Sequence, residues 1–364
     1  LHFELATSSC ANHPWLLKIR IMVPLHFPNN IQIQTTAYCN AKCSFCPYPV
    51  TSKELPMGNM EQEVFEKIIK EIAQYEVALV QPFLMSDPLM DKRIIQRIAM
   101  IQHYMPNTRI NITTNGYLLN ERIIKSLVDL NIETIHISSN GITPDTYRKT
   151  MGIDGVAVFR NVNLLIDALR AAGARTEVIV TAISLKETKE EIFLARAYWR
   201  ARGVTFYMNP LNDRAGNIDE SDFEGMLPFD DAFNTTQLLS YDMSGCPALY
   251  TYMGILFNGD LVTCCHDWRR SLVLGNVKEK SLMEIWNDRP YRELRKLSEE
   301  GRLCERDLCA KCGENRFSID HQALQNYLEQ MAEHPEQSVE VNVAKMFMNA
   351  QAEDYESMKL GLFR

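Results

Sequence analysis

At 364 residues with 46% of them hydrophobic, the chain can bury the core of one large domain and a smaller one, or of two domains. Its net charge of −8, with both signs mixed along the chain, argues against a broad surface for nucleic acid or for an anionic membrane. No apolar run approaches the ~20 residues that cross a bilayer, and no secretory signal opens the chain, so we expect a cytoplasmic protein with small-molecule or protein-like partners.

Strands and helices alternate from residue 31 onward, after a proline-punctuated lead-in of residues 1–30. Strands joined by crossovers form a parallel sheet with right-handed connections. The pattern therefore predicts an α/β fold with six parallel strands. In chain order the predicted elements are strand 31–35, helix 60–75, strand 78–83, helix 93–104, strand 109–113, helix 120–129, strand 134–138, helices 143–150 and 158–172, strand 177–183, helix 189–202 and strand 204–209.

The ten cysteines fall into two groups, one at 39–46 and one at 246–312, with Cys10 alone outside them. The cytosol keeps thiols reduced, so disulfides are rare there. The grouping favours metal binding as their use.

Three of these thiols, Cys39, Cys43 and Cys46, lie in one short loop directly after the first predicted strand. An iron–sulfur cube ordinarily takes four thiolates, so three leave one iron open to an outside ligand. The spacing Cys-x3-Cys-x2-Cys, with Phe45 before the last cysteine, resembles the radical S-adenosylmethionine (radical SAM) superfamily. The alternative is half of a zinc site, which usually needs a second Cys/His pair nearby, and no such pair lies close to this loop in the sequence.

The resemblance implies a partial (β/α)6 TIM-like barrel with its chemistry at the carboxyl ends of the strands. In this family the amino and carboxylate groups of SAM chelate the open iron of a [4Fe-4S] cluster. One electron, supplied from outside by a donor of the flavodoxin or ferredoxin type, then cleaves SAM to a 5′-deoxyadenosyl radical.

Polar residues follow several of the predicted strands. Ser86 and Asp87 stand where the family usually has a Gly-Gly-Glu-Pro segment, so the resemblance makes them candidates to contact the SAM amino group. The departure shortens the acidic side chain by one methylene. The alternative is an ordinary turn, because Asp-Pro is a common turn dipeptide.

Further SAM contacts are implied after the later strands. Thr114 and Asn115 match the family's Thr-Asn-Gly turn beside the SAM ribose and carboxylate, although Asn-Gly alone is only a turn signal. Ser138 belongs to a segment similar to the family's Ser-x-Asp-Gly, with Asn140 in place of the acid. Arg214, after the last predicted strand, is a candidate to hold a substrate anion or the SAM carboxylate, with a solvent-exposed loop arginine as the alternative.

The second cysteine group has the pattern Cys-x12-Gly-x4-Cys followed by Cys-x2-Cys. Asn258-Gly259 predicts the turn of a hairpin over 254–263, and residues 275–286 read as a turn leading into a helix. This region resembles the SPASM/twitch domain, which binds one or two auxiliary [4Fe-4S] clusters. We assign one auxiliary cluster to Cys246, Cys264, Cys309 and Cys312, leaving Cys265 and Cys304 unassigned, while a structural zinc at the same four thiolates is the alternative.

The resemblance divides the chain into a lead-in (1–30), a radical SAM partial barrel (31–235), a SPASM/twitch domain (236–320) and a helical tail (321–364). Apolar residues at helical spacing in the tail are expected to cover the barrel.

The implied function is abstraction of a hydrogen atom from a small hydroxyl- or amino-bearing substrate, similar to a sugar or cyclitol, with net oxidation assisted by the auxiliary cluster. Three alternatives remain open. Cys265 is a candidate hydrogen-atom donor in a radical epimerase, the protein is a maturase of a ribosomally made peptide, or it is a non-catalytic iron–sulfur protein. Thirty residues before the first strand are too few for the leader-binding domain of many maturases, which favours a small substrate.

Overall fold

A nine-stranded sheet organises the part of the chain that the computed structural model describes, residues 27–183, 185, 188–209, 211, 213–218 and 246–312. Its strand order is β6-β5-β4-β3-β2-β1-β7-β8-β9, and neighbours from β1 to β6 pair in parallel. The six predicted parallel strands are confirmed as β1 (Asn30–Ile33), β2 (Leu79–Gln81), β3 (Arg109–Thr114), β4 (Thr134–Ser138), β5 (Glu177–Ile183) and β6 (Thr205–Asn209). Among the described residues the sheet is open, with β6 and β9 at its edges.

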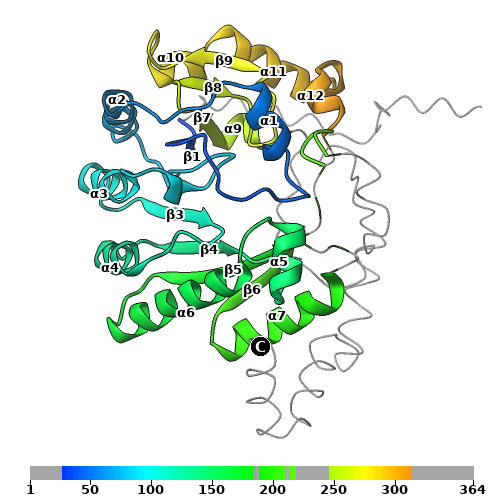
Figure 1. Cartoon of the computed structure of the whole chain (residues 1–364). Helices are drawn as coiled ribbons and strands as arrows, with labels where there is room; N and C mark the ends of the chain where they lie inside the picture. The colour runs from blue at the N-terminus through cyan, green and yellow to red at the C-terminus, as the bar shows by residue number, and fades with distance from the viewer. Residues whose placement is uncertain are drawn as a thin grey trace, which may run out of the picture.

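Amphipathic helices join these strands, and Figure 1 shows α2, α3 and α4 stacked along one side of the sheet. Side-chain caps fix where several of them begin. Asn120 accepts a hydrogen bond from the Ile123 N–H at the start of α4, and Asp154 accepts one from the Val156 N–H at the start of α6. The connecting helices are α2 (Gln62–Ile72), α3 (Ile94–Tyr104), α4 (Glu121–Leu130), α5 (Pro144–Thr150), α6 (Gly155–Ala171) and α7 (Lys189–Ala201).

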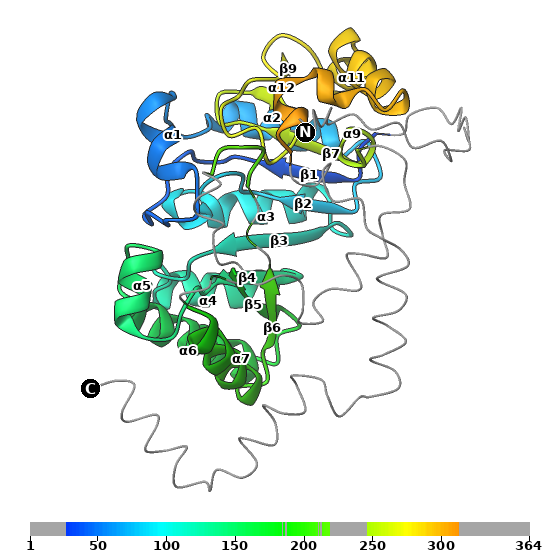
Figure 2. The same ribbon diagram turned by 90° about the vertical axis from the view of Figure 1, so that its right-hand side faces the viewer.

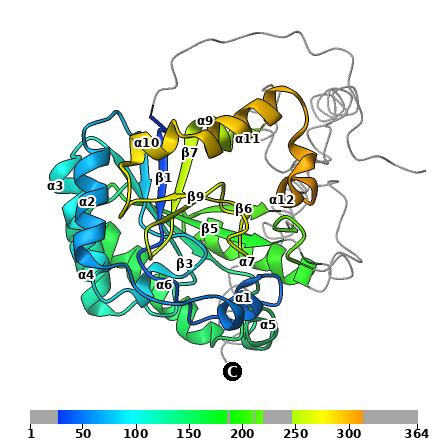
Figure 3. The ribbon, with the colours of Figure 1, turned by 90° about the horizontal axis from the view of Figure 1, so that it is seen from above.

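The C-terminal cysteine region, residues 246–312, extends the same sheet. Strand β7 (Tyr252–Ile255) pairs in parallel with β1, and β8 (Asp260–Val262) pairs antiparallel with β7, which confirms the predicted hairpin. The expected turn at 275–277 is wrong in part, because Gly275 and Asn276 belong to a further strand, β9 (Val273–Asn276), that pairs with β8. Figure 3 shows the helices of this region running past β7; they are α9 (Ala248–Thr251), α10 (Leu282–Trp286), α11 (Arg289–Glu299) and α12 (Asp307–Ala310).

Two short helices lie where the parallel strands end. Figure 2 shows α1 (Tyr48–Glu54) and α5 at the end of the sheet toward which β3 points. Helix α1 directly follows the first cysteine loop, and the short 3-10 helix η1 (Pro88–Met90) follows β2. The carboxyl ends of the strands are therefore the place where the loops gather. None of the described helices is long and apolar enough to cross a membrane, and the predicted helical tail lies outside the described residues.

A buried arginine ties α3 to the first strand and its loop. Arg97 is 1% exposed and lies 3.2 Å from the Asp91 carboxylate, which is 4% exposed. It also donates to the carbonyl oxygens of Thr35 and Met60. Removing one partner of a buried ion pair leaves the other charge buried without a counter-charge. We therefore expect Arg97→Met to lower the free energy of unfolding by about 3–5 kcal/mol in urea denaturation. Arg93→Met, at an exposed position four residues earlier, serves as the control and should change it little.

Candidate active site

One cavity, which we call the thiol cavity, lies among the loops that follow β1 to β5 and encloses about 820 Å³ of space open to solvent. Every site residue predicted from the N-terminal part of the sequence lines it: Cys39, Cys43, Cys46, Ser86, Asp87, Thr114, Asn115, Ser138 and Arg214. Residues from several strand ends therefore line one cavity, and their contacts with a cluster and SAM stay a prediction.

Backbone hydrogen bonds to the end of α5 hold the first cysteine loop in place. The backbone N–H of Lys42 donates to the Met151 carbonyl oxygen at 2.9 Å, and that of Ser44 donates to the Thr150 carbonyl oxygen at 2.9 Å. Gly152 has a φ of +67°, and a Cβ added there would lie 3.3 Å from Lys42 Cβ. The left-handed backbone and this close approach both favour glycine at that position.

A tyrosine that the sequence reasoning missed steadies the same loop from the other side. The Cys39 N–H donates to the Tyr48 hydroxyl oxygen at 2.8 Å. Tyr48 is the first residue of α1, so this helix and the loop form one unit. Its position two residues after Cys46 was the only signal in the sequence for such a role.

The turns after β2 and β3 are tied to the cysteine loop and to each other. The Asp87 N–H donates to the Tyr38 carbonyl oxygen, and Asn115 Nδ2 donates to Asn40 Oδ1 at 2.9 Å. The fully buried Asp87 carboxylate accepts hydrogen bonds from Thr114 Oγ1 and the Asn115 N–H, both at 2.9 Å.

Asp87 is thus chiefly an organiser of the Thr114–Asn115 turn in this structure. Its Oδ1 also accepts from the Leu89 N–H at 2.9 Å, which starts η1. The expected contact between Asp87 and the SAM amino group stays a prediction, and the role that the structure adds is positioning. Sequence could not indicate it, because the partners lie 27 and 28 residues away on another strand.

The first three thiols lie close enough to influence one another. Burial, the Asp87 carboxylate and Cys46 raise the pKa of Cys39 to about 12. Burial, Cys46 and Cys39 raise the pKa of Cys43 well above its ordinary value. Burial also raises the pKa of Cys46, while the Arg214 guanidinium opposes the rise. Because thiolates at this spacing repel, the trio becomes ionised only with a compensating positive charge such as iron.

The four thiols predicted for the second site are also brought together. Burial, Cys265, Cys246 and Cys312 raise the pKa of Cys264 well above its ordinary value. Burial, Cys246 and Cys312 raise the pKa of Cys309 to about 12. Cys264 follows β8, Cys309 lies in α12, and Cys246 is fixed by its N–H, which donates to Ser298 Oγ at 3.0 Å.

Two protein-family models match the chain: the radical SAM superfamily over residues 33–195 and an iron–sulfur cluster-binding domain, SPASM, over residues 246–313. The chain therefore contains a radical SAM domain and a SPASM domain. A radical SAM domain binds a [4Fe-4S] cluster together with SAM, and a SPASM domain binds auxiliary iron–sulfur clusters.

Named relatives span nearly the whole of this radical SAM chain. It is 23% identical over 299 residues to the S-adenosyl-L-methionine-dependent 2-deoxy-scyllo-inosamine dehydrogenase of Niallia circulans, covering 82% of this chain and 97% of that protein. The crystal structure of BtrN in complex with AdoMet and 2-DOIA matches with a TM-score of 0.56 at 19% identity, over 79% of this chain and 93% of that one. Streptococcus suis SuiB bound to the precursor peptide SuiA matches with a TM-score of 0.59 at 20% identity, over 74% and 67%. The two structural matches show a shared fold.

The residues of the thiol cavity fit a radical SAM cluster and its nucleoside ligand. Besides the three thiols, one polar side-chain atom of the cavity lining, Ser86 Oγ, is buried without a hydrogen-bond partner among the described residues. An unpaired buried polar atom is costly, so it indicates a polar ligand. Within the described residues no group of three His, Cys, Asp or Glu side chains is arranged to hold a single metal ion.

Cys265 lies apart from this radical SAM cavity. It packs against a small apolar cluster of Leu84, Leu256 and Val262 and does not line the thiol cavity. The structure therefore does not bring the candidate hydrogen-atom donor to the site. Cys304 lies in the 3-10 helix η4 (Leu303–Glu305), before α12.

A second residue missed by the sequence reasoning is His266, whose ring approaches the auxiliary site. Its Nδ1 lies 3.9 Å from Cys312 Sγ, and the side chain is buried. The sequence did not indicate a role for His266, because its neighbour Cys312 is 46 residues away in the chain.

A carboxylate on α7 holds the loop after β4, which carries Ser138 and Asn140 toward the cavity. Glu191 accepts hydrogen bonds from the Ile142 and Thr143 N–H groups, each at 3.1 Å. Burial pushes the pKa of Glu191 up, but these bonds and those from the Thr146 and Thr143 hydroxyls outweigh it and lower the pKa below its ordinary value.

We expect Glu191→Gln to lower the free energy of unfolding by about 1 kcal/mol at neutral pH. A lowered folded-state pKa stabilises the fold above the unfolded-state value of about 4.3, and this contribution is lost as pH falls through the folded-state value. Urea denaturation from pH 7 downward should show the two proteins converging in acid. The control Glu133→Gln, at an exposed position, should match the wild type throughout.

Proposed function

We propose that this protein is a radical SAM dehydrogenase that oxidises a small hydroxyl- or amino-bearing substrate, with one auxiliary [4Fe-4S] cluster as the electron acceptor. One observation carries the proposal: the thiol cavity is lined both by the first three cysteines and by Trp268, which lies four residues after Cys264. A substrate in this cavity would lie between the two cysteine groups.

Each group of residues has a distinct part in the proposal. Cys39, Cys43 and Cys46 would hold the first cluster, and when SAM is bound there the pair supplies hydrogen-atom abstraction from an unactivated carbon. Cys246, Cys264, Cys309 and Cys312 would hold the auxiliary cluster, which accepts the electron left on the substrate. The division of the chain at residues 31–235 and 236–320 belongs to the same proposal.

The polar residues of the cavity wall would orient SAM. Ser86, Thr114 and Ser138 offer hydroxyl groups, and Asn115 is fixed by its contact with Asn40. Arg214 lies near Cys46, whose pKa it lowers, so its guanidinium is placed to meet a carboxylate beside the cluster. An external donor of the flavodoxin or ferredoxin type would supply the electron.

The relatives support oxidation of a small molecule. The Niallia circulans protein, which this chain spans almost completely, is named as a dehydrogenase of 2-deoxy-scyllo-inosamine. Because SuiB is described with a precursor peptide, a peptide substrate is the alternative that the experiment must separate.

The test uses the anaerobically reconstituted holoenzyme with SAM, a reductant and a panel of aminocyclitols labelled with deuterium at carbon. We expect 5′-deoxyadenosine that carries deuterium and a product lighter than its substrate by two hydrogens. A product of unchanged mass that takes up solvent hydrogen indicates epimerisation instead. Absence of 5′-deoxyadenosine with every substrate would contradict the enzyme assignment.

A further inference from the structure

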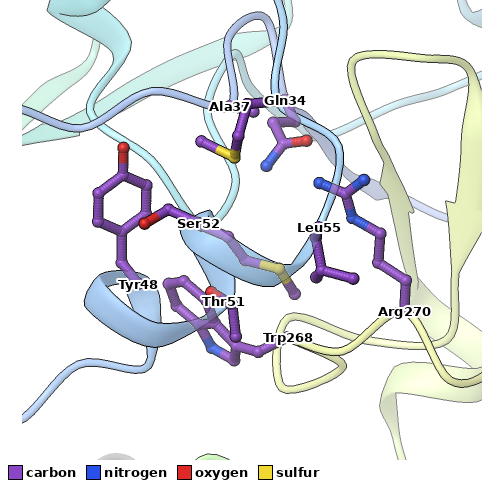
Figure 4. Close-up of a pocket in the computed structure, with 10 residues that line it drawn as sticks. Gln34, Ala37, Tyr48, Thr51, Ser52, Leu55, Trp268 and Arg270 are labelled. Atoms are coloured by element: carbon purple, nitrogen blue, oxygen red, sulfur yellow. The ribbon is translucent and has the colours of Figure 1, made fainter.

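A second, smaller pocket adjoins the thiol cavity on the side of the C-terminal cysteine region. We call it the Arg270 pocket; it encloses about 280 Å³ and is lined by Gln34, Tyr48, Ser52, Met85, Trp268 and Arg270, among others. Figure 4 shows Arg270 and Trp268 entering it from the loop after β8, while Tyr48, Ser52 and Leu55 come from α1. The pocket thus lies between the two cysteine-bearing parts of the chain.

The Arg270 pocket combines a largely apolar lining with one cation. None of the described residues that line it is a carboxylate, and Arg270 is the only charged side chain among them. The Tyr48 hydroxyl accepts from the Cys39 N–H, which leaves its own proton to donate. Ser52 adds a further hydroxyl. Such a lining is complementary to an anion.

Arg270 is held in place for this task. Its guanidinium lies over the Phe257 ring at 5.5 Å, and no described carboxylate lies within ion-pair distance of it. Burial lowers the pKa of Arg270, and the nearby Asp260 and Asp267 carboxylates oppose that shift. The neighbouring Arg269 differs, because it is exposed and pairs with Glu54 at 2.7 Å. The φ of Arg270 is +54°, a backbone conformation unusual for arginine that is associated with functional sites.

The two cavities are neighbours that share one wall residue. Trp268 lines both of them, and the adjacent residues Met85 and Ser86 line one each. A substrate whose anionic group binds Arg270 would therefore extend past Trp268 toward the three thiols.

We propose that the Arg270 pocket binds an anionic group of the substrate, a carboxylate or a phosphate, through the Arg270 guanidinium. The inference rests on the proposed function and adds to it: the substrate carries a negative charge besides its hydroxyl or amino group. Binding the substrate anion in the Arg270 pocket, outside the thiol cavity, orients the reacting carbon of the substrate. It also keeps the substrate anion away from the SAM carboxylate.

The test measures anion binding directly by calorimetry. The anaerobic holoenzyme with bound SAM is titrated with sodium phosphate or with sodium acetate. Choline chloride keeps the ionic strength constant. Arg270→Asn removes the charge and suits the left-handed backbone, so it is expected to fold. Arg270→Lys keeps the charge, and Arg269→Asn is the matched control. Iron content and melting temperature confirm that each variant is folded.

We expect saturable binding of at least one anion to the wild type and to Arg269→Asn, weakened by about 10-fold to 100-fold in Arg270→Asn and less in Arg270→Lys. Binding of phosphate alone assigns a phosphorylated substrate, and binding of acetate alone assigns a carboxylate. Absence of saturable binding, or equal affinity in Arg270→Asn, would overturn the proposal. Formation of 5′-deoxyadenosine by the same samples shows whether the proposed function stands when the anion site fails.

Discussion

Cys43→Ala is expected to abolish 5′-deoxyadenosine formation and to lower the iron content by about four atoms per chain, because two thiolates cannot hold a [4Fe-4S] cluster. Cys43 is the middle residue of the loop that α5 and α1 fix in place. Iron analysis and detection of 5′-deoxyadenosine after anaerobic reconstitution give both readouts. The iron that remains should belong to the auxiliary site.

Cys265→Ala is the matched control for this experiment. Cys265 is also a half-buried cysteine, yet it packs against Leu84, Leu256 and Val262 and is not among the residues that line the thiol cavity. Its replacement should leave the iron content and SAM cleavage close to wild type. If Cys43→Ala kept its full iron content and its cleavage activity, the cluster would have to lie elsewhere.

Asp87→Asn is expected to weaken SAM binding by about 10-fold to 100-fold, since a buried charge-assisted hydrogen bond is worth about 1.5–3 kcal/mol. The amide NH2 group that replaces one carboxylate oxygen cannot accept a hydrogen bond. Either the Leu89 N–H or the Thr114 hydroxyl and the Asn115 N–H therefore lose their acceptor. The turn beside the cavity then loses the group that fixes it. Equilibrium dialysis of labelled SAM against the anaerobic holoenzyme measures the effect.

Asp145→Asn provides the comparison for Asp87→Asn, because Asp145 is exposed and pairs only with Arg148 at the surface. It should bind SAM as the wild type does. Unchanged SAM affinity in Asp87→Asn would show that the turn after β3 keeps its shape without this carboxylate, and would remove the positioning role.

Local patterns were sufficient to predict most of the parallel sheet. The hydrophobic strands and their capped helices alternate with short connections, so each element is determined by residues near it in the chain. The pairing of β7 with β1 was not predictable in this way. It joins segments more than 200 residues apart, as the hydrogen bond from Tyr252 Oη to Gln32 Oε1 illustrates with a separation of 220 residues.

Two elements, α1 and β9, were not predicted because each contains residues that usually interrupt a helix or a strand. In helix α1, Pro47 is the N-cap and Pro49 lies in the first turn, where proline is tolerated. Gly275 and Asn276 suggested a turn, but they pair with β8 as part of β9.

Some residues of the candidate site were predictable from the sequence and others were not. Cysteine spacing predicted the first three thiols as one group, because Cys39, Cys43 and Cys46 lie in one short loop. Trp268 and Arg270 were missed, since a charged loop residue carries no signal until the fold places it against another segment. Arg270 reaches its pocket only because β7 and β8 extend the sheet beside β1.

The central claim is that Cys39, Cys43 and Cys46 bind a cluster with one iron left open for SAM. Electron paramagnetic resonance of the reduced protein tests it most directly, using the Cys309→Ala variant to remove the auxiliary cluster from the spectrum. We expect a [4Fe-4S] signal whose g values shift on addition of SAM. A signal that saturating SAM leaves unchanged, or a protein that retains only zinc, would contradict the claim.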